Sequence, residues 1–431
     1  MADQTVPATP YRRRVVDDFL DEFQPESPAI TIAGPKGVGK TATALRRAAS
    51  VMSFDLPADR ARLDADPTLL TALDYPVLVD EWQRKPESWD YVRRAVDAGA
   101  PAGAYLLTGS ATTPRGVTVH SGAGRFIDVR MRPLSFFERD IAFPTVSMSA
   151  LLRGSSEIGG ETDVGLAEYV EEMTASGFPD IRRLSPRVRR RRLEAYVDNI
   201  VQREFAEHGY PVRRPATLRA WLRAYAAATS TTTSYNDILD AATAGENDKP
   251  SRTTTTVYRD VLAQLWQLDP VEAWLPSRNH LDRLTQAPKH HLADPALAAV
   301  LLGLDAEQLM RGTASAAGLR DGAVLGQLFE HLVTLSVLVY AEAAEAHVRH
   351  LRTKGGDHEV DLIVERRDGR VLALEVKLKA TPAEKDFRHL RWLKEQLGHD
   401  LVDAAVVTTG QHAYRRGQDG IAVVPLALMG P

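Results

Sequence analysis

Three charged residues near the C-terminus lie in a segment that otherwise predicts two apolar strands. Asp361 and Glu375 each stand near a strand end, away from the Asp-Gly turn between the strands, and Lys377 follows Glu375 by two residues. If Arg366–Arg370 form a five-residue loop, Asp361 lies opposite Glu375, and side-chain alternation puts all three charges on one face. Carboxylates about 5 Å apart repel each other, and a divalent cation bound by both removes that repulsion. We therefore predict a metal site at Asp361 and Glu375, with Lys377 orienting water or stabilising a phosphate, as in a metal-dependent phosphodiesterase; the alternative is a surface hairpin with a cross-strand Asp–Lys pair.

A second set of residues has the spacing of a phosphate-binding loop. The segment GPKGVGKT, residues 34–41, follows the apolar strand AITIA and precedes a helical pattern. Its glycines let backbone N–H groups surround phosphates, Lys40 reaches the β- and γ-phosphates, and the Thr41 hydroxyl joins the shell of a Mg²⁺ ion. ATP and Mg²⁺ are thus the expected cofactors. The predicted nucleotide-contacting residues are Gly34, Pro35, Lys36, Gly37, Val38, Gly39, Lys40, Thr41 and Ala42.

Polar residues that end the next two apolar runs complete the predicted nucleotide site. Asp80 and Glu81 end the run YPVLVDE, where Asp80 can hold Mg²⁺ and Glu81 can polarise the attacking water. Ser110, or alternatively Thr108, ends YLLTGS and could bond the γ-phosphate or the water, although an ordinary strand-end turn has the same composition. Arg125 is either an arginine finger for a neighbouring subunit's nucleotide, which requires a homo-oligomer, or an ordinary surface arginine.

The elements that must position these residues predict a multidomain α/β protein with four regions. Residues 1–143 alternate buried strands with helices, the pattern of a parallel sheet with helices on both faces that carries the P-loop. Residues 144–210 read as a helical lid, and residues 211–288 as three helices and a hairpin, the pattern of a winged helix-turn-helix. Residues 289–431 combine a long helix with strands and a further helix in a C-terminal α/β domain.

Composition limits the classes of function. The chain has 431 residues, a net charge of −4 and no cysteine, so it has room for several domains, lacks a global basic field, and cannot form disulfides or thiolate zinc sites. Its first residues lack the apolar core of a signal peptide, and we expect no run of about 18–20 apolar residues that could cross a membrane. A cytoplasmic location and no membrane partner are therefore predicted.

Two stretches could contact nucleic acid. Seven arginines lie between Arg182 and Arg192, and they either bind phosphates or pair with the acidic helix EYVEEM or another subunit. The helix SRTTTTVYRDVLAQL is the expected recognition helix, capped by Ser251 or Thr253. Its outward residues are predicted to be Thr254, Thr255, Tyr258 and Arg259. Winged helices also bind proteins, so the motif alone leaves DNA or a protein as the partner.

Several segments, in order, resemble a prokaryotic family of predicted AAA-type ATPases with a winged helix and a C-terminal PD-(D/E)XK nuclease-like domain. They include AITIAGPKGVGKTATA, YPVLVDEWQRKP, GAGRFIDVRMRPLSFFE, SGFPDIRR, GAVLGQLFEHLV and EVDLIVE…ALEVK, and the resemblance covers nearly the whole chain. It implies that Glu330, in GQLFEHL, joins Asp361, Glu375 and Lys377 in the nuclease-like site. Many relatives have Arg-Gln where this chain has Lys36-Gly37, and no clear second sensor arginine is present.

These observations predict an ATP-hydrolysing AAA-type ATPase that acts on DNA. In this hypothesis, nucleotide state controls the winged helix and the access of DNA to a Mg²⁺-dependent nuclease-like site. One alternative is a nucleotide-dependent switch in defence, toxin–antitoxin or transcriptional control, with a catalytically silent nuclease-like domain. The other is a protein-remodelling ATPase that uses the winged helix to hold its partner.

Overall fold

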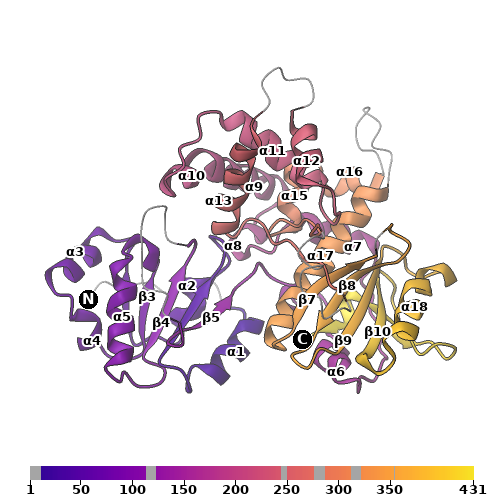
Figure 1. Ribbon diagram of the computed structural model, residues 1–431, viewed down its shortest axis with the longest axis horizontal. Coiled ribbons are helices and arrows are strands. Elements are labelled where there is room, and N and C mark those ends of the chain that lie inside the picture. The colour runs from indigo at the N-terminus through magenta and orange to yellow at the C-terminus, as the bar shows by residue number, and fades with distance from the viewer. Residues whose placement is uncertain (1–10, 113–122, 244–249, 276–286, 312–321, 354) are drawn as a thin grey trace. The chain divides into compact units, whose positions relative to one another are not determined.

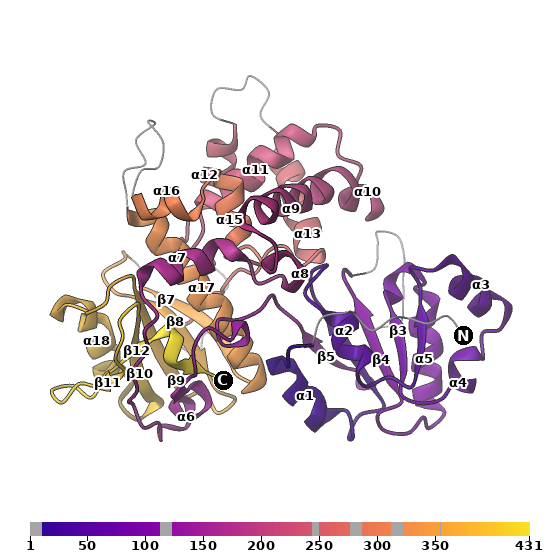
Figure 2. The same ribbon diagram turned by 180° about the vertical axis from the view of Figure 1, so that it is seen from behind.

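In the computed structural model, the chain forms two compact units (Figures 1 and 2). Unit 1 consists of Met1–Ala33, Gly39–Gly109 and Val119–Val129, and unit 2 of Gly34–Val38, Ser110–Thr118 and Arg130–Pro431. The division passes through the predicted phosphate loop, since its first five residues group with unit 2 and the following helix with unit 1. The structure describes residues 11–112, 123–243, 250–275, 287–311, 322–353 and 355–431.

Unit 1 is built on the predicted parallel sheet. Its five strands have the order β2-β3-β4-β1-β5, and the pairs β2/β3, β3/β4 and β4/β1 are parallel. Strand β4 separates β1, which leads into the phosphate loop, from β3, which ends in Asp80. The strands are β1 (Ala29–Ala33), β2 (Ser50–Ser53), β3 (Val77–Asp80), β4 (Tyr105–Gly109) and β5 (Ile127–Arg130).

Helices cover both faces of this sheet. On one face, Trp89 and Val92 pack with Val77, Val79 and other side chains in a core that excludes water. Figure 1 shows α1 and α2 on the opposite side of the strands from α3, α4 and α5. The helices are α1 (Val15–Phe23), α2 (Lys40–Leu45), α3 (Pro57–Ala65), α4 (Leu69–Ala72) and α5 (Glu87–Asp97). Burial on both faces explains why the strands read as continuous apolar runs.

Unit 2 begins with helices that include one irregular segment. Helix α9 continues into a π-helix, η3, before α10. The elements of this part are β6 (Val146–Ser147), α6 (Met148–Arg153), α7 (Leu166–Ala175), α8 (Pro179–Arg182), α9 (Pro186–Asn199), η3 (Ile200–Glu204) and α10 (Phe205–Glu207).

The region predicted as a winged helix contains the three expected helices, α11 (Pro215–Ala227), α12 (Tyr235–Ala242) and α13 (Arg252–Gln264). Antiparallel bridges follow at Leu268↔Leu292 and Val271↔Lys289, while residues 276–286 between them lie outside the described residues. The assignment as a winged helix stays a prediction.

Two details of α13 can be compared with the sequence. The Thr254 backbone N–H donates to Ser251 Oγ over 3.2 Å, so Ser251 rather than Thr253 is the cap. The expectation that Tyr258 points outward is wrong, because it is 7% exposed and its ring packs near Phe205 and Trp221. An aromatic ring gains more from this apolar neighbourhood than from water.

The C-terminal part of unit 2 is a mixed six-stranded sheet with the order β11-β12-β10-β9-β8-β7. Its elements are α15 (Pro295–Leu302), α16 (Ala306–Arg311), α17 (Gly322–Ala343), β7 (His347–Arg352), β8 (Glu359–Glu365), β9 (Val371–Lys377), α18 (Arg388–Leu397), β10 (Leu401–Thr408), β11 (Tyr414–Arg415) and β12 (Ala422–Pro425). A short strand, β13 (Met429–Gly430), pairs with β6.

The register of the β8–β9 hairpin agrees with the predicted five-residue loop. Glu365 pairs with Val371, and Leu362 pairs with Leu374. From the alternation of side chains, the hairpin was predicted to have one apolar face and one charged face. Instead, Ile363 also packs in a core with side chains of α18, so the hairpin is apolar on both faces and charged only near one end. That placement concentrates the charges of Asp361, Glu375 and Lys377 at one place.

Helix α17 corrects the expectation about apolar runs. Ala323–Ala343 is long and apolar enough to cross a membrane, by length and composition alone. However, 61% of its most apolar window is buried, and the helix carries Glu330 and His331 at its middle. These features are typical of the core helix of a globular domain. The cytoplasmic location stays a prediction.

Candidate functional site

Asp80 is the centre of a hydroxyl cluster at the end of β3. It is 7% exposed, and its carboxylate accepts hydrogen bonds from Thr41 Oγ1 at 2.7 Å, Thr108 Oγ1 at 2.5 Å and Ser53 Oγ at 3.1 Å. The strand register explains two of these neighbours, since Asp80 pairs with Thr108 on one side and Ser53 on the other. The structure therefore brings together Thr41 and Asp80, the two predicted Mg²⁺ ligands.

The donor set at Asp80 fits a hard divalent cation. Mg²⁺ prefers one or two carboxylate or hydroxyl oxygens together with waters and phosphate oxygens. Thr41 and Asp80 supply two such oxygens 2.7 Å apart. These oxygens agree with the Mg²⁺ site that the phosphate-loop motif predicts.

Glu81 follows Asp80 in a left-handed backbone conformation, with a φ of 53°. Non-glycine residues adopt this conformation at a cost, and such residues are frequent at functional sites. The Gln83 side-chain amide donates to Glu81 Oε2, so the carboxylate is oriented by its neighbour.

The phosphate loop depends on its glycines. Gly34, Gly37 and Gly39 have φ angles of 154°, 83° and 104°. A Cβ at Gly34 would lie 2.1 Å from the carbonyl oxygen of Met131, a distance at which no side chain fits. Lys40 and Thr41 then begin α2, and the N-terminus of a helix is a favourable position for an anion.

The part of the loop that belongs to unit 2 is held by helical residues. Lys36 Nζ forms an ion pair with Glu204 Oε1 at 3.1 Å, and the Tyr196 hydroxyl donates to the Lys36 carbonyl oxygen at 3.2 Å. Glu204 is buried at the end of the π-helix η3. Neither Glu204 nor Tyr196 was singled out from the sequence, because no local motif links them to a loop some 160 residues earlier.

The two remaining predicted residues of the nucleotide site are placed as follows. Ser110 is buried, and the hydroxyl of Thr108, the alternative candidate, donates to Asp80. Arg125 forms an ion pair with Asp97 on α5 of its own unit. The roles of Ser110 and Arg125, and the homo-oligomer that an arginine finger would require, stay predictions.

The four predicted residues of the C-terminal site converge. Lys377 Nζ lies 2.6 Å from Glu375 Oε1 and 3.7 Å from Asp361 Oδ2, and the Val376 N–H donates to Asp361 Oδ2 at 2.9 Å. Glu330 reaches the same place from α17 through a residue that the sequence analysis missed, Lys289.

Lys289 joins the carboxylates from the antiparallel bridge that follows α13. Its Nζ lies 2.8 Å from Glu330 Oε1, 2.9 Å from Asp361 Oδ1 and 3.4 Å from Glu359 Oε1. The only sequence signal was a lone lysine in the segment APKHHLADPAL, directly before two histidines that the structure buries. A buried lysine needs counter-charges, and their positions were not visible from spacing.

Burial and mutual repulsion shape the electrostatics of this cluster. Burial, together with the negative charge of Asp361, raises the pKa of Glu375 to about 8 and that of Glu330 to about 7. Burial alone would also raise the pKa of Asp361, but the ammonium groups of Lys289 and Lys377 outweigh it and hold that pKa below its ordinary value. Asp361 is thus the charged centre between two lysines.

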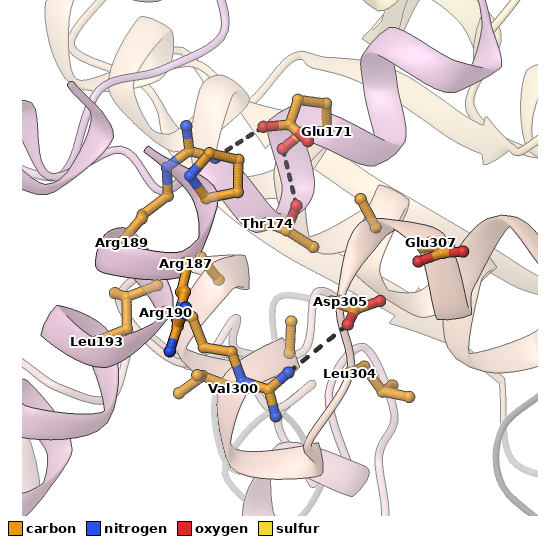
Figure 3. A pocket seen from close by; sticks show the side chains of 14 residues that line it. Glu171, Thr174, Arg187, Arg189, Arg190, Leu193, Val300, Leu304, Asp305 and Glu307 are labelled. Atoms are coloured by element: carbon orange, nitrogen blue, oxygen red, sulfur yellow. Dashed lines mark hydrogen bonds and ion pairs between the residues drawn. The ribbon is translucent and has the colours of Figure 1, made fainter. Parts of the chain in front are cut away.

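The arginines of α8 and α9 show the second of their two predicted arrangements at several positions. Arg182 forms two bonds to Glu172, and Arg189 Nη1 lies 2.7 Å from Glu171 Oε1, both on the acidic helix α7. Arg190 reaches Asp305 at 3.6 Å, across a pocket of about 430 Å³ (Figure 3). Arg191, by contrast, is 83% exposed and pairs only with Glu194 of its own helix in the described part of the chain.

A buried ion-pair network was also missed. Asp269 Oδ1 accepts from Arg130 Nη1 at 2.9 Å and Asp269 Oδ2 from Arg132 Nε at 2.7 Å, and Arg132 also pairs with Glu342. The two arginines alternate in the segment DVRMRP, which was quoted from the sequence only because it resembles the AAA-type family.

Comparison with known proteins agrees with the first of these sites. Residues 26–139 match the family model described as "AAA domain". The parallel sheet, the glycine loop and the Thr41–Asp80 pair of this region agree with that match. Residues 166–308 and 325–429 match two models that are each described as a domain of unknown function, DUF8612 and DUF4143. The assignments as winged helix and nuclease-like domain therefore stay predictions.

Similar proteins were found among both sequences and structures. Uncharacterized protein Mb2031c of Mycobacterium bovis and uncharacterized protein Rv2008c of Mycobacterium tuberculosis are each 25% identical over 403 residues, which cover 92% of this chain and 80% of the relative. The Walker-type ATPase PABY2304 of Pyrococcus abyssi has a TM-score of 0.38 and 15% identity, with 69% of this chain and 99% of that chain covered. The ORC2 protein of Aeropyrum pernix has a TM-score of 0.28 and 13% identity, with 76% and 97% covered.

Proposed function

We propose that the protein binds ATP with Mg²⁺ and hydrolyses it at the phosphate loop. The observation that supports this most directly is the hydroxyl cluster at Asp80, where the loop's own Thr41 donates to the carboxylate that ends β3. In P-loop enzymes these two side chains share the shell of the metal ion that neutralises the β- and γ-phosphates. Lys40, the first residue of α2, is the side chain that would reach those phosphates.

Glu81 is the proposed general base. Its backbone conformation turns the chain immediately after the metal-binding carboxylate, and Gln83 orients its side chain. A carboxylate next to the metal can accept a proton from the attacking water as the water's oxygen bonds the γ-phosphorus and the β–γ bridging bond breaks.

We also propose that nucleotide state acts on unit 2 through the first five residues of the loop. These residues group with unit 2, and Lys36 is tied there to Glu204 and Tyr196. An ATP phosphate at the loop would compete with the Glu204 carboxylate for the ammonium of Lys36. The nucleotide would thereby change a contact inside unit 2 as well as filling its own site.

DNA is the target that we propose for unit 2. Arg191 is exposed on α9, and Arg252 and Thr253 are exposed in the first turn of α13, next to its cap Ser251. Helix N-termini and arginines are common phosphate contacts. A protein partner held by the same helices is the alternative.

Phosphate release by the full chain tests the ATPase proposal. With Mg²⁺ and ATP, Lys40→Ala, Asp80→Asn and Glu81→Gln should each lower the rate at least about a hundredfold, since each removes one part of the phosphoryl-transfer machinery. Glu81→Gln should keep ATP binding, measured with a fluorescent ATP analogue. Asp55→Asn is the matched control, because this exposed carboxylate pairs with Arg84 in the same unit. A wild-type protein that neither binds nor hydrolyses ATP, with or without DNA, refutes the proposal.

Fluorescence anisotropy with labelled duplex and single-stranded DNA tests the proposed target. Contacts to phosphates predict an affinity that falls steeply as salt rises, and Arg191→Ala should reduce that slope by about one unit. If the protein does not bind the labelled DNA, or if its affinity for DNA does not depend on salt, the protein-remodelling alternative is favoured.

A further inference from the structure

The side chain of Lys289 occupies one side of Asp361, a predicted metal ligand of the C-terminal site, and Lys377 lies between Asp361 and Glu375. Backbone hydrogen bonds in both directions with Val271, each 2.9 Å, fix the lysine at the bridge after α13. Its side chain is 1% exposed and ends among Glu330, Asp361 and Glu359. An ammonium has three N–H donors, and these three carboxylates can accept all of them.

Four carboxylate oxygens of the site already accept hydrogen bonds. Asp361 Oδ1 accepts from Lys289, and Asp361 Oδ2 accepts from the Val376 N–H. Glu330 Oε1 accepts from Lys289, and Glu375 Oε1 accepts from Lys377. Glu375 Oε2 has no hydrogen-bond partner among the described residues. Nor do those residues include a group of three or more acidic or histidine side chains arranged to hold a metal ion.

A divalent cation does not fit this arrangement for two physical reasons. Mg²⁺ requires near-octahedral oxygen ligands at about 2.1 Å, whereas the carboxylates here are spaced around an ammonium at hydrogen-bond distances. A metal ion near Asp361 would also be repelled by two ammonium groups, that of the buried Lys289 and that of the half-buried Lys377. The residue types match the nuclease pattern, but the positive charge beside Asp361 is the ammonium of Lys289, not a metal ion.

We infer that Lys289 is the resident cation of the cluster that Glu330, Glu359 and Asp361 form beside Glu375, and that it excludes a divalent metal ion from this site. The C-terminal domain then acts as a binding or structural module and does not cut phosphodiesters with a metal bound there. This inference does not depend on the proposed ATPase activity, because it concerns residues of unit 2 alone.

Binding of Mn²⁺ to the full chain without nucleotide, followed by electron paramagnetic resonance and calorimetry, tests the inference. Wild type should show no site at the cluster, so Asp361→Asn should leave its Mn²⁺ binding unchanged. Lys289→Met removes the ammonium while keeping an unbranched side chain, and it should gain one Mn²⁺ site at least tenfold tighter than any in wild type. The double variant Lys289→Met with Asp361→Asn should lose that site again. Lys379→Met is the control, since this lysine pairs with Asp386 outside the cluster.

Two results would overturn the inference. One is a stoichiometric Mn²⁺ site in wild type that disappears in Asp361→Asn. The other is a folded Lys289→Met variant, judged by circular dichroism, that gains no site. The wild-type comparison decides the question even when Lys289→Met does not fold, because it needs no substitution of the lysine.

Discussion

Asp269 offers a sharp test of how the buried arginines of unit 2 are held. Its carboxylate is the shared acceptor for Arg130 and Arg132, and all three lie in unit 2. Burial alone would raise the pKa of Asp269, but the two guanidinium groups outweigh it and hold that pKa below its ordinary value. The change Asp269→Asn keeps the shape of the side chain and removes the charge that both arginines use.

The magnitude follows from burial. Removing one partner from a buried ion pair leaves an uncompensated charge and costs about 3–5 kcal/mol. Glu342 still accepts from Arg132 at 3.3 Å, while Arg130 keeps only the Leu268 carbonyl among its described hydrogen bonds, so the loss should fall within that range. Urea m-values are about 1–3 kcal/mol per M for small proteins and rise with chain length, so a loss of about 3–5 kcal/mol should lower the midpoint of the unfolding transition by roughly 1 M.

Urea unfolding followed by tryptophan fluorescence and circular dichroism measures this shift. Asp368→Asn is the matched control, because Asp368 also pairs with two arginines, Arg366 and Arg370, but at the surface. Surface pairs contribute about 0–1 kcal/mol, so the control should move the midpoint little. Equal shifts in the two variants, or a shift below about 1 kcal/mol for Asp269→Asn, would refute the reasoning from burial.

Three further predictions use other features of the chain. Burial lowers the pKa of His331 from 6.5 to about 4. The neutral side chain therefore contributes stability that is present above pH 6.5 and is lost as the pH falls toward 4. The urea midpoint of His331→Gln should vary less with pH across that window than the midpoint of the wild type. Gly34→Ala should abolish ATP-analogue binding and lower the melting temperature, because its Cβ meets the Met131 carbonyl. Gly99→Ala, at a position that also has a positive φ but has open space around it, should lower only the melting temperature and by less. Ser251→Ala should cost about 1 kcal/mol of stability in urea unfolding through the lost cap of α13, and Thr253→Ala should cost clearly less.

Short sequence patterns predicted those features of the fold that depend on residues close together in the chain. The apolar runs predicted the parallel sheet, and the five-residue loop predicted the register that places Asp361 near Glu375. Turn length fixes a hairpin register, and alternation fixes the face of each side chain. These rules need no knowledge of the rest of the chain.

The missed residues all act across long separations in sequence. Lys289 meets Asp361 across 72 positions, and Asp269 meets Arg132 across 137. A single charged residue in an apolar segment indicates a buried partner but does not identify it. The outward placement of Tyr258 failed for a related reason, because helical periodicity could not show that Phe205 and Trp221 cover that side of α13.

The π-helix at the end of α9 has a consequence for how this chain tolerates insertions and deletions. A π turn holds one residue more than an α turn, and each residue of a helix turns the following side chains by about 100°. Because the π turn already holds one extra residue, deleting one residue at its start would restore regular winding and leave the side chains that follow close to their present directions. A deletion in the regular part of α9 would instead rotate Glu204 by about 100° away from Lys36, so this turn is the place where the helix best tolerates the loss of a residue.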